Sequence, residues 1–278
     1  MSSYLRPTTL SDALHALSEQ RSTIIAGGTD FYPARVGKPL DEDVLDVTAI
    51  ESLRAIEDGG DHYVIGATTT WTDLIREDLP DWFRAMKLAA KEVGGVQIQN
   101  AGTIVGNVCN ASPAADGAPG LLALDASVVL ASLSGERIIP ITEFVLGNRR
   151  TARKPDEIVV GLRIPKCRED AKSTFLKLGA RKYLVISIVM VSAVIEVSAE
   201  GMVDRCRVAV GSCSEVATRL QDLETELCGM PADDRLAGLV TTDHLAPLSP
   251  IGDVRGSADY RRDAALTLVR RAIDELTG

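Results

Sequence analysis

The sequence has no block of basic residues. Its 278 residues include 30 lysines and arginines against 39 aspartates and glutamates, a formal net charge of -9. Proteins that bind nucleic acids neutralise phosphates with lysine and arginine gathered on one face. The nearest approach here is two arginine pairs on an expected C-terminal helix, at 261–262 and 270–271. We therefore expect no nucleic-acid partner.

The sequence also lacks an apolar run long enough to cross a membrane. The best candidate, residues 184–197, is interrupted by Ser187, Ser192 and Glu196, whereas a spanning helix needs about 18 or more apolar residues. The first residues turn polar before any apolar run develops, which is not the pattern of a signal peptide. These features predict a cytoplasmic protein with no membrane span.

Metal-binding patterns are missing as well. No two of the five cysteines form a C-x-x-C pair, and the three histidines are scattered along the chain. Iron–sulfur clusters and structural zinc sites need clustered ligands. We therefore expect free thiols and no metal site in this chain.

The pattern of apolar residues that is present predicts an α+β protein. Asp81 is the expected N-cap of a helix that ends at Gly94, and the polar stretch 166–173 indicates a domain boundary. Helices are expected at 11–20, 72–76, 81–93, 215–227 and 257–276, and strands at 22–26, 44–47, 63–67, 126–133, 137–141, 158–164, 174–178, 184–197 and 203–211.

A glycine turn follows the first of these strands, where residues 24–30 read IIAGGTD. The G-x-G-x-x-G spacing of a dinucleotide fingerprint is absent. Glycines nevertheless let backbone N–H groups approach a ligand closely, and such a turn can form an anion-binding nest. A plain tight turn is the more common alternative for this segment taken alone.

A second segment, residues 95–119, is rich in glycine, asparagine and alanine and poor in charge. We interpret it as a buried binding loop rather than a linker. It offers donors for flavin carbonyls and phosphates, and Asp116 as an acceptor for a sugar hydroxyl. Capping of the following helix is an alternative role for Asp116.

Together these segments resemble the FAD-binding subunit of the xanthine dehydrogenase and carbon monoxide dehydrogenase family of molybdenum hydroxylases. The matching motifs, in family order, are AGGTDF at 26–31, QIQNAGTIVGN at 97–107, ASPAAD at 111–116, FLKL at 175–178 with RK at 181–182, and DVRGSADYRR at 253–262. The resemblance covers nearly the whole chain.

The resemblance implies a two-part fold. Residues 1–168 would form an FAD-binding domain of the PCMH/vanillyl-alcohol-oxidase type, with subdomains at about 1–55 and 56–168. Residues 169–278 would form an α+β C-terminal domain of the CO dehydrogenase flavoprotein type, with an antiparallel sheet and helices.

The resemblance also implies a set of FAD contacts. The first segment would hold the pyrophosphate and adenosine side, and the second the phosphate and flavin side. For Lys177 a solvated strand lysine is the alternative. Two departures from the family pattern, Val105 in place of a glycine and Val185 in place of an aspartate, bear on the flavin site. The implied contacts are Ile24, Ile25, Ala26, Gly27, Gly28, Thr29, Asp30, Phe31, Val93, Gly102, Thr103, Ile104, Val105, Gly106, Asn107, Asp116, Val159 and Lys177.

By the same resemblance, the chain passes electrons and oxidises no primary substrate itself. Its partners would be a molybdopterin-binding large subunit and a [2Fe–2S] small subunit, in a dimer of heterotrimers. Electrons would pass from the clusters through FAD to NAD or another acceptor, with no catalytic side chain in this chain. Two alternatives stay open: a stand-alone FAD oxidoreductase of the same fold, and a redox-inactive nucleotide-binding assembly subunit.

Overall fold

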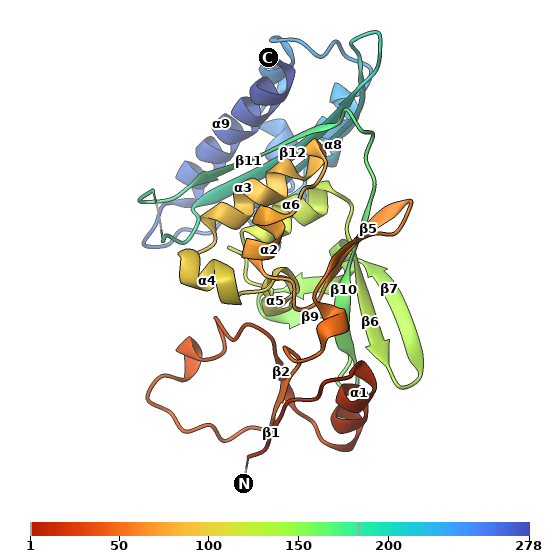
Figure 1. The fold of residues 1–278 in the computed structure, drawn as a ribbon. Helices are drawn as coiled ribbons and strands as arrows, with labels where there is room; N and C mark the ends of the chain where they lie inside the picture. Colours follow the sequence, from red (N-terminus) through yellow and green to blue (C-terminus); the bar gives the residue numbers. More distant parts are fainter. Residues whose placement is uncertain (1, 183) are drawn as a thin grey trace.

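The computed structural model describes residues 2–182 and 184–278. The chain begins with a small three-stranded parallel sheet, in the order β1-β3-β2, with α1 beside it (Figure 1). The Thr9 side chain caps α1 by accepting a hydrogen bond from the Asp12 N–H. The elements are β1 (Tyr4–Leu5), α1 (Leu10–Glu19), β2 (Thr23–Ile25) and β3 (Val44–Asp46).

A five-stranded antiparallel sheet follows, in the order β4-β5-β10-β6-β7. Ile65, Val128 and Leu162, one from each of three adjacent strands, are fully buried in its core. The expected hairpin of residues 126–141 is confirmed as β6 and β7. The strands are β4 (Ile56–Asp58), β5 (His62–Gly66), β6 (Ser127–Ser132), β7 (Gly135–Pro140) and β10 (Ile158–Pro165), with the separate pair β8 (Val145–Gly147) and β9 (Arg150–Thr151).

Short helices occupy the segment between β5 and β6. The prediction of a binding loop over 95–119 was wrong in conformation, because three helices, α4 to α6, lie at or within its limits. The Asp81 N-cap was wrong too: Asp81 begins a 3₁₀ turn, and α3 starts after Phe83 without a side-chain cap. Stacking of Trp82 on Phe83, with centroids 4.2 Å apart, buries both rings in that turn. The helices are α2 (Trp71–Arg76), α3 (Arg84–Glu92), α4 (Val96–Ala101), α5 (Ile104–Asn110), α6 (Gly117–Ala123) and α7 (Ile141–Phe144).

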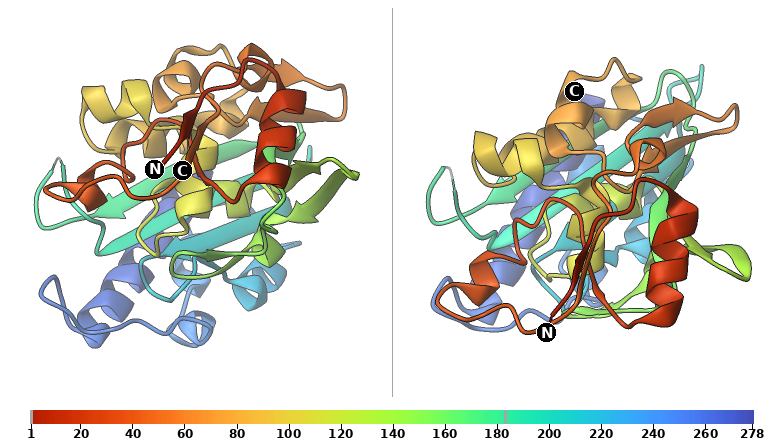
Figure 2. Two further views of the ribbon diagram at one scale, coloured as in Figure 1. Left: turned by 90° about the horizontal axis from the view of Figure 1, so that it is seen from below. Right: turned by 60° about the horizontal axis from the view of Figure 1, so that its bottom comes forward.

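The C-terminal part is a four-stranded antiparallel sheet between two helical layers. Helices α8 and α9 cover one face, and α3 and α6, from the N-terminal half of the chain, cover the other (Figures 1 and 2). Successive residues of β12 serve the two faces in turn, since Met190 packs on α3 and Val191 joins the cluster under α9. The elements are β11 (Lys172–Leu178), β12 (Val189–Val197), β13 (Val203–Gly211), β14 (Thr218–Arg219), α8 (Gln221–Leu227) and α9 (Ala258–Thr277).

Two expected boundaries in this part were wrong. The strand predicted from residue 184 begins at Val189, because Leu184 has a φ of 51° and the buried Arg261 guanidinium binds the Ile188 carbonyl at 2.6 Å. The helix predicted from residue 215 begins at Gln221. Residues Thr218 and Arg219 instead pair with β13 as an edge strand.

Within the residues described, no helix is both long and apolar enough to cross a bilayer.

Candidate functional site

Both glycine segments line one cavity of about 440 Å³, although they are far apart in the sequence. Its lining residues come from the N-terminal region and from helices α4 and α5, which Figure 1 shows near one another. Of the expected cofactor contacts, it brings together Ile25, Ala26, Gly27, Gly28, Thr29, Asp30, Phe31, Val93, Gly102, Thr103, Gly106 and Asn107.

Glycine is required at positions 27 and 28 of the first segment, at each for a different structural reason. Gly28 has a φ of 67°, a conformation that favours glycine, and its carbonyl accepts a hydrogen bond from the Tyr32 N–H. A Cβ at Gly27 would lie only 1.8 Å from the Ala101 carbonyl oxygen, at the end of α4. A residue without a side chain is therefore needed at position 27, so that the two segments can pack on each other. The sequence had indicated only that this glycine lets a ligand approach the backbone.

Helix α5 presents the second segment to the cavity. Thr103 caps α5, its hydroxyl oxygen accepting the Gly106 N–H at 3.0 Å. One turn along, Asn107 lines the cavity, and its buried Oδ1 has no hydrogen-bond partner among the described residues. Because buried polar atoms are normally paired, this amide fits a ligand with polar groups, as a flavin dinucleotide has.

Two arginines that the sequence interpretation missed also line this cavity. The Arg35 guanidinium lies 3.7 Å from the Phe31 ring centroid and forms an ion pair with Glu42. Arg149 donates to the neutral Asn110 side chain at 3.2 Å, so its charge suits an anionic group such as a diphosphate. Neither arginine belongs to a sequence motif. Arg149 lies on the β8–β9 turn, and only the folded chain brings it to the cavity. The other lining residues outside the set of implied contacts are Thr23, Ala34, Trp71, Ile98 and Asn110, of which the sequence had indicated Asn110 as a hydrogen-bonding side chain of the second segment.

Three expected contacts line a second, apolar cavity of about 80 Å³, which lies behind the first. Ile24, Val105 and Val159 line it, together with Ala26 and Gly106, which it shares with the larger cavity. The methyl groups of Val105 therefore occupy the hydrophobic core. Ile104 is fully buried in the same core and lines neither space.

Asp116 and Lys177 form a buried ion pair outside both cavities. Lys177 Nζ lies 3.0 Å from Asp116 Oδ2, and Ser187 donates to Asp116 Oδ1 at 2.8 Å. Burial raises the pKa of Asp116, and the ammonium of Lys177 opposes that rise. The solvated-lysine interpretation was wrong, because the Lys177 side chain is only 5% exposed. The helix-cap alternative for Asp116 was wrong too, since its side chain makes no capping bond.

A third cavity, of about 380 Å³, adjoins the first at the end of α3. Val93 lines the first cavity and its neighbour Glu92 lines the third. Lys177 and Val185 face the third cavity as well, together with Leu178, Gly179, Arg181 and Lys182. The valine that departs from the family pattern at position 185 therefore belongs to this third space.

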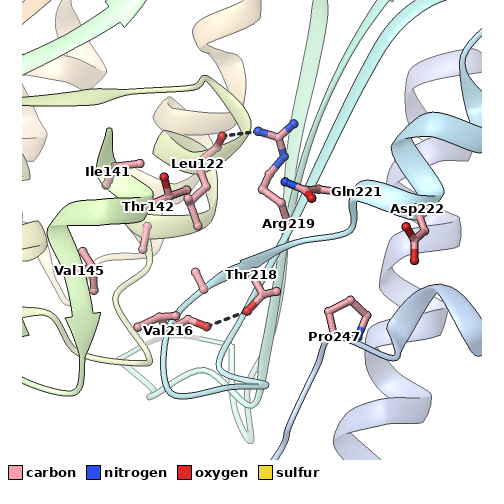
Figure 3. Close-up of a pocket in the computed structure, with 12 residues that line it drawn as sticks. Leu122, Ile141, Thr142, Val145, Val216, Thr218, Arg219, Gln221, Asp222 and Pro247 are labelled. Atoms are coloured by element: carbon pink, nitrogen blue, oxygen red, sulfur yellow. Dashed lines mark hydrogen bonds between the residues drawn. The ribbon is translucent and has the colours of Figure 1, made fainter. Parts of the chain in front are cut away.

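A further cavity of about 420 Å³ lies where the two halves of the chain meet, and Figure 3 shows it. Leu122, Ile141 and Val145 face Thr218 and Pro247 across it. None of the expected cofactor contacts lines this space. Its one guanidinium, that of Arg219, is bound by Asp125 and Glu224. The glycine-lined cavity is therefore the candidate cofactor site.

Comparison with known proteins bears on the whole chain. Residues 1–167 match the model of the FAD binding domain in molybdopterin dehydrogenase, and residues 174–276 match the CO dehydrogenase flavoprotein C-terminal domain. The nicotinate dehydrogenase FAD-subunit of Eubacterium barkeri is 33% identical over 82% of this chain and 80% of that protein. The glyceraldehyde dehydrogenase medium chain of Sulfolobus acidocaldarius is 28% identical over 99% of this chain and 98% of that protein.

Solved structures of relatives have the same fold. A carbon monoxide dehydrogenase chain from Hydrogenophaga pseudoflava superimposes with a TM-score of 0.89 at 28% identity, covering 99% of this chain and 96% of that one. The expected fold class, a two-part FAD-binding fold with an antiparallel sheet and helices, is thereby confirmed. The chain belongs to the FAD-binding flavoprotein subunits of the xanthine and CO dehydrogenase family, and it is an oxidoreductase component whose cofactor is FAD.

Proposed function

We propose that this chain transfers electrons within a molybdenum hydroxylase, from [2Fe–2S] clusters on a small subunit through FAD to NAD or another acceptor. The observation that carries the proposal is the single cavity lined by both glycine segments. Its volume of about 440 Å³ lies in the range typical of cofactor pockets.

We propose the eighteen residues named above as the FAD site, with Arg35, Trp71 and Arg149 added; Ile104 supports the site from the core, and the others provide its contacts. Gly28 offers a backbone N–H group, and Arg149 positive charge, for the pyrophosphate. Thr103 and Asn107 offer polar groups for the flavin side, and Ile24, Val105 and Val159 supply apolar surface behind them. Asp116 acts by fixing Lys177, and its carboxylate keeps acceptor capacity for a sugar hydroxyl.

When bound, FAD supplies chemistry that accepts electrons singly or in pairs and releases them. The chain's own residues bind and orient it. Arg149 offsets phosphate charge, and Val93 and Ile98 add apolar surface to the wall of the cavity. We propose no side-chain nucleophile or general base.

The assembly that we propose contains a molybdopterin-binding large subunit and a [2Fe–2S] small subunit, as a dimer of heterotrimers in the cytoplasm. Support comes from the relatives, which are named as medium chains of dehydrogenases and as the medium subunit of a hydroxylase. We propose domain limits of 1–168, with subdomains of about 1–55 and 56–168, and 169–278. The start of β11 at Lys172 supports the second limit.

The direct test is titration of the purified apoprotein with FAD, followed by calorimetry and by absorbance near 450 nm. Asn107→Leu keeps the branched shape and the number of non-hydrogen side-chain atoms and removes the amide, and Asn148→Leu makes the same change on an exposed turn outside the cavity. Loss of one hydrogen bond to the ligand costs about 1.4 kcal/mol, so Asn107→Leu should weaken binding roughly tenfold while Asn148→Leu leaves it unchanged.

A wild-type protein that takes up no FAD would rule out the proposal and leave a redox-inactive assembly subunit. Equal binding by the two variants would remove Asn107 from the site. Purification from the native host separates the remaining alternative: we expect two partner chains, molybdenum and iron to accompany the yellow protein, whereas a stand-alone oxidoreductase would purify without them.

A further inference from the structure

Ser187 and Arg261 line neither the glycine-lined cavity nor the third cavity, yet both act on the segment that holds the buried Asp116–Lys177 pair. Ser187 lies just before β12 and is only 2% exposed. Its hydroxyl donates to Asp116 Oδ1 at 2.8 Å, and Lys177 Nζ binds the other carboxylate oxygen at 3.0 Å. Both oxygens of this carboxylate are therefore held by protein groups.

The backbone beside Ser187 is held by the second residue. Arg261, near the start of α9, is 3% exposed and donates through Nη1 to the carbonyls of Ile188, at 2.6 Å, and Ser212, at 3.1 Å. Its Nη2 binds Asp253 at 2.8 Å. Because the donors of a guanidinium are fixed in one plane, these contacts hold the Ile188 carbonyl, and with it the adjoining Ser187, in one position.

Lys177 extends these contacts to the edge of the FAD site. It lines the third cavity, which adjoins the glycine-lined one where Glu92 and Val93 lie. Its Nζ also donates to the Glu92 carbonyl at 3.3 Å. Because the lysine stem is flexible, the fixed and charged carboxylate of Asp116 is what keeps the ammonium at this place.

The charge of Asp116 depends on the same contacts. Burial raises the pKa of this carboxyl, contacts with Lys177 and Ser187 lower it, and the charge of Glu92 raises it. Of these contacts, the one with the Ser187 hydroxyl can be removed without removing a charge. Its loss should raise the pKa of Asp116, so that the carboxyl is protonated at a higher pH.

We propose that Ser187 and Arg261 are positioning residues for the cofactor: Arg261 fixes the backbone beside Ser187, and Ser187 keeps Asp116 oriented toward Lys177 at the edge of the FAD site. Neither residue touches FAD itself. The inference rests on the proposed function. It gives a role in the cofactor site to two positions of the C-terminal part, one of them in the motif DVRGSADYRR.

The test measures the affinity of the purified full-length apoprotein for FAD by calorimetry, at several pH values from 6 to 8.5. Relative to the wild type, Ser187→Ala should bind FAD about tenfold more weakly at pH 6 but less than about threefold more weakly at pH 8.5. Ser192→Ala is the matched control, because it removes another buried hydroxyl, whose bond goes to the Thr174 carbonyl rather than to Asp116. Its pH profile should be that of the wild type.

Two further comparisons separate positioning from general stability. Arg261→Lys keeps the charge but loses the planar set of donors, so its affinity should also fall more at pH 6 than at pH 8.5, whereas Arg262→Lys at the exposed next position should have no effect. In an Asp116→Asn background residue 116 cannot titrate. There Ser187→Ala should change the FAD affinity by less than about twofold, and equally at every pH.

A wild-type pH profile in Ser187→Ala or in Arg261→Lys would overturn the proposal, and so would equal changes in Ser192→Ala or Arg262→Lys. A loss of affinity in Ser187→Ala that is the same at all pH values would also overturn it, because the hydroxyl would then only stabilise the local fold. A wild-type protein that binds no FAD at any pH would instead overturn the proposed function.

Discussion

Gly27 and Gly28 are adjacent, yet different physical constraints select glycine at each. At Gly28 the constraint is the backbone dihedral angle φ, which is 67°. At Gly27 it is space, because the Ala101 carbonyl oxygen lies where a Cβ would be. A family motif of two glycines thus combines one residue that shapes the turn with one that lets two segments of protein meet.

The contact at Gly27 leads to a prediction about the apoprotein. Gly27→Ala should destabilise it by about 3 kcal/mol even with no cofactor present, because the clash is with backbone that cannot rotate away. Thermal unfolding without FAD measures this. Gly238→Ala is the matched control, since no atom lies within 4 Å of a Cβ there. An apoprotein unchanged by Gly27→Ala, with only FAD binding lost, would contradict this explanation.

At the scale of elements, the buried pair of Asp116 and Lys177 joins the start of α6 to β11. Lys177→Met should lower the free energy of unfolding by about 3 kcal/mol at neutral pH, because it leaves a buried carboxylate without its cation. Asp116→Asn/Lys177→Met should cost less than the sum of the two single changes. Urea unfolding of the four proteins measures both effects.

The loss of unfolding free energy caused by Lys177→Met should become larger as pH rises. Burial raises the pKa of Asp116 in the folded protein above the ordinary carboxyl value, and Lys177 opposes the rise. The folded state therefore holds the proton more tightly than the unfolded state, and the cost of the charged carboxylate appears as pH rises through the folded pKa. The Lys177→Met penalty should be smaller at pH 5 than at pH 8. An equal penalty at both would mean that Asp116 is not its source.

The elements that the sequence predicted well are the long, strongly periodic ones. Strand β13 and helix α9 have apolar residues repeating at the spacing of a buried face, so local pattern and tertiary packing agree. The short helices α4 and α5 were predicted as loop. They have only 6 and 7 residues, too few for the apolar pattern of a helix to repeat, so the sequence alone does not identify them. Contacts with the rest of the fold stabilise them.

The candidate site was predicted only where its residues form contiguous motifs, just as the elements were predicted well only where their apolar pattern is long and periodic. Its glycine segments are contiguous motifs, and the structure brings them to one cavity. Arg35 and Arg149 come from segments with no motif, one at the end of a 3₁₀ turn and the other between two short strands. Their relevance exists only in the folded chain. The same holds for Ser187, whose partner Asp116 is distant in sequence.

For the whole molecule, the C-terminal sheet links the two halves of the chain. Phe175 and Met190 pack against Ala85 and Ala89 of α3, so the N-terminal half supplies one cover of this sheet. Beside that contact, Asp125 binds Arg205, Arg207 and Arg219 of β13 and β14. The proposed domain limit at residue 168 therefore divides the sequence without dividing the packing.

This arrangement predicts the behaviour of the two parts when they are made separately. Residues 1–168 and 169–278, co-expressed as two polypeptides, should associate and elute together from a sizing column at the mass of the intact chain. The second part alone should aggregate, because its sheet would expose the apolar face that α3 and α6 normally cover. A monomeric, soluble second part with full strand content by circular dichroism would show that this cover is dispensable.

The contact between the Ala101 carbonyl and residue 27 also bears on how the cofactor is acquired. It is made by protein atoms alone, so the turn that follows β2 can pack on the end of α4, and α4 on α2, before FAD arrives. We therefore expect the apoprotein to fold with its FAD site formed. Cells starved of riboflavin should accumulate a folded, colourless chain that turns yellow within minutes once the vitamin's nucleotide is restored.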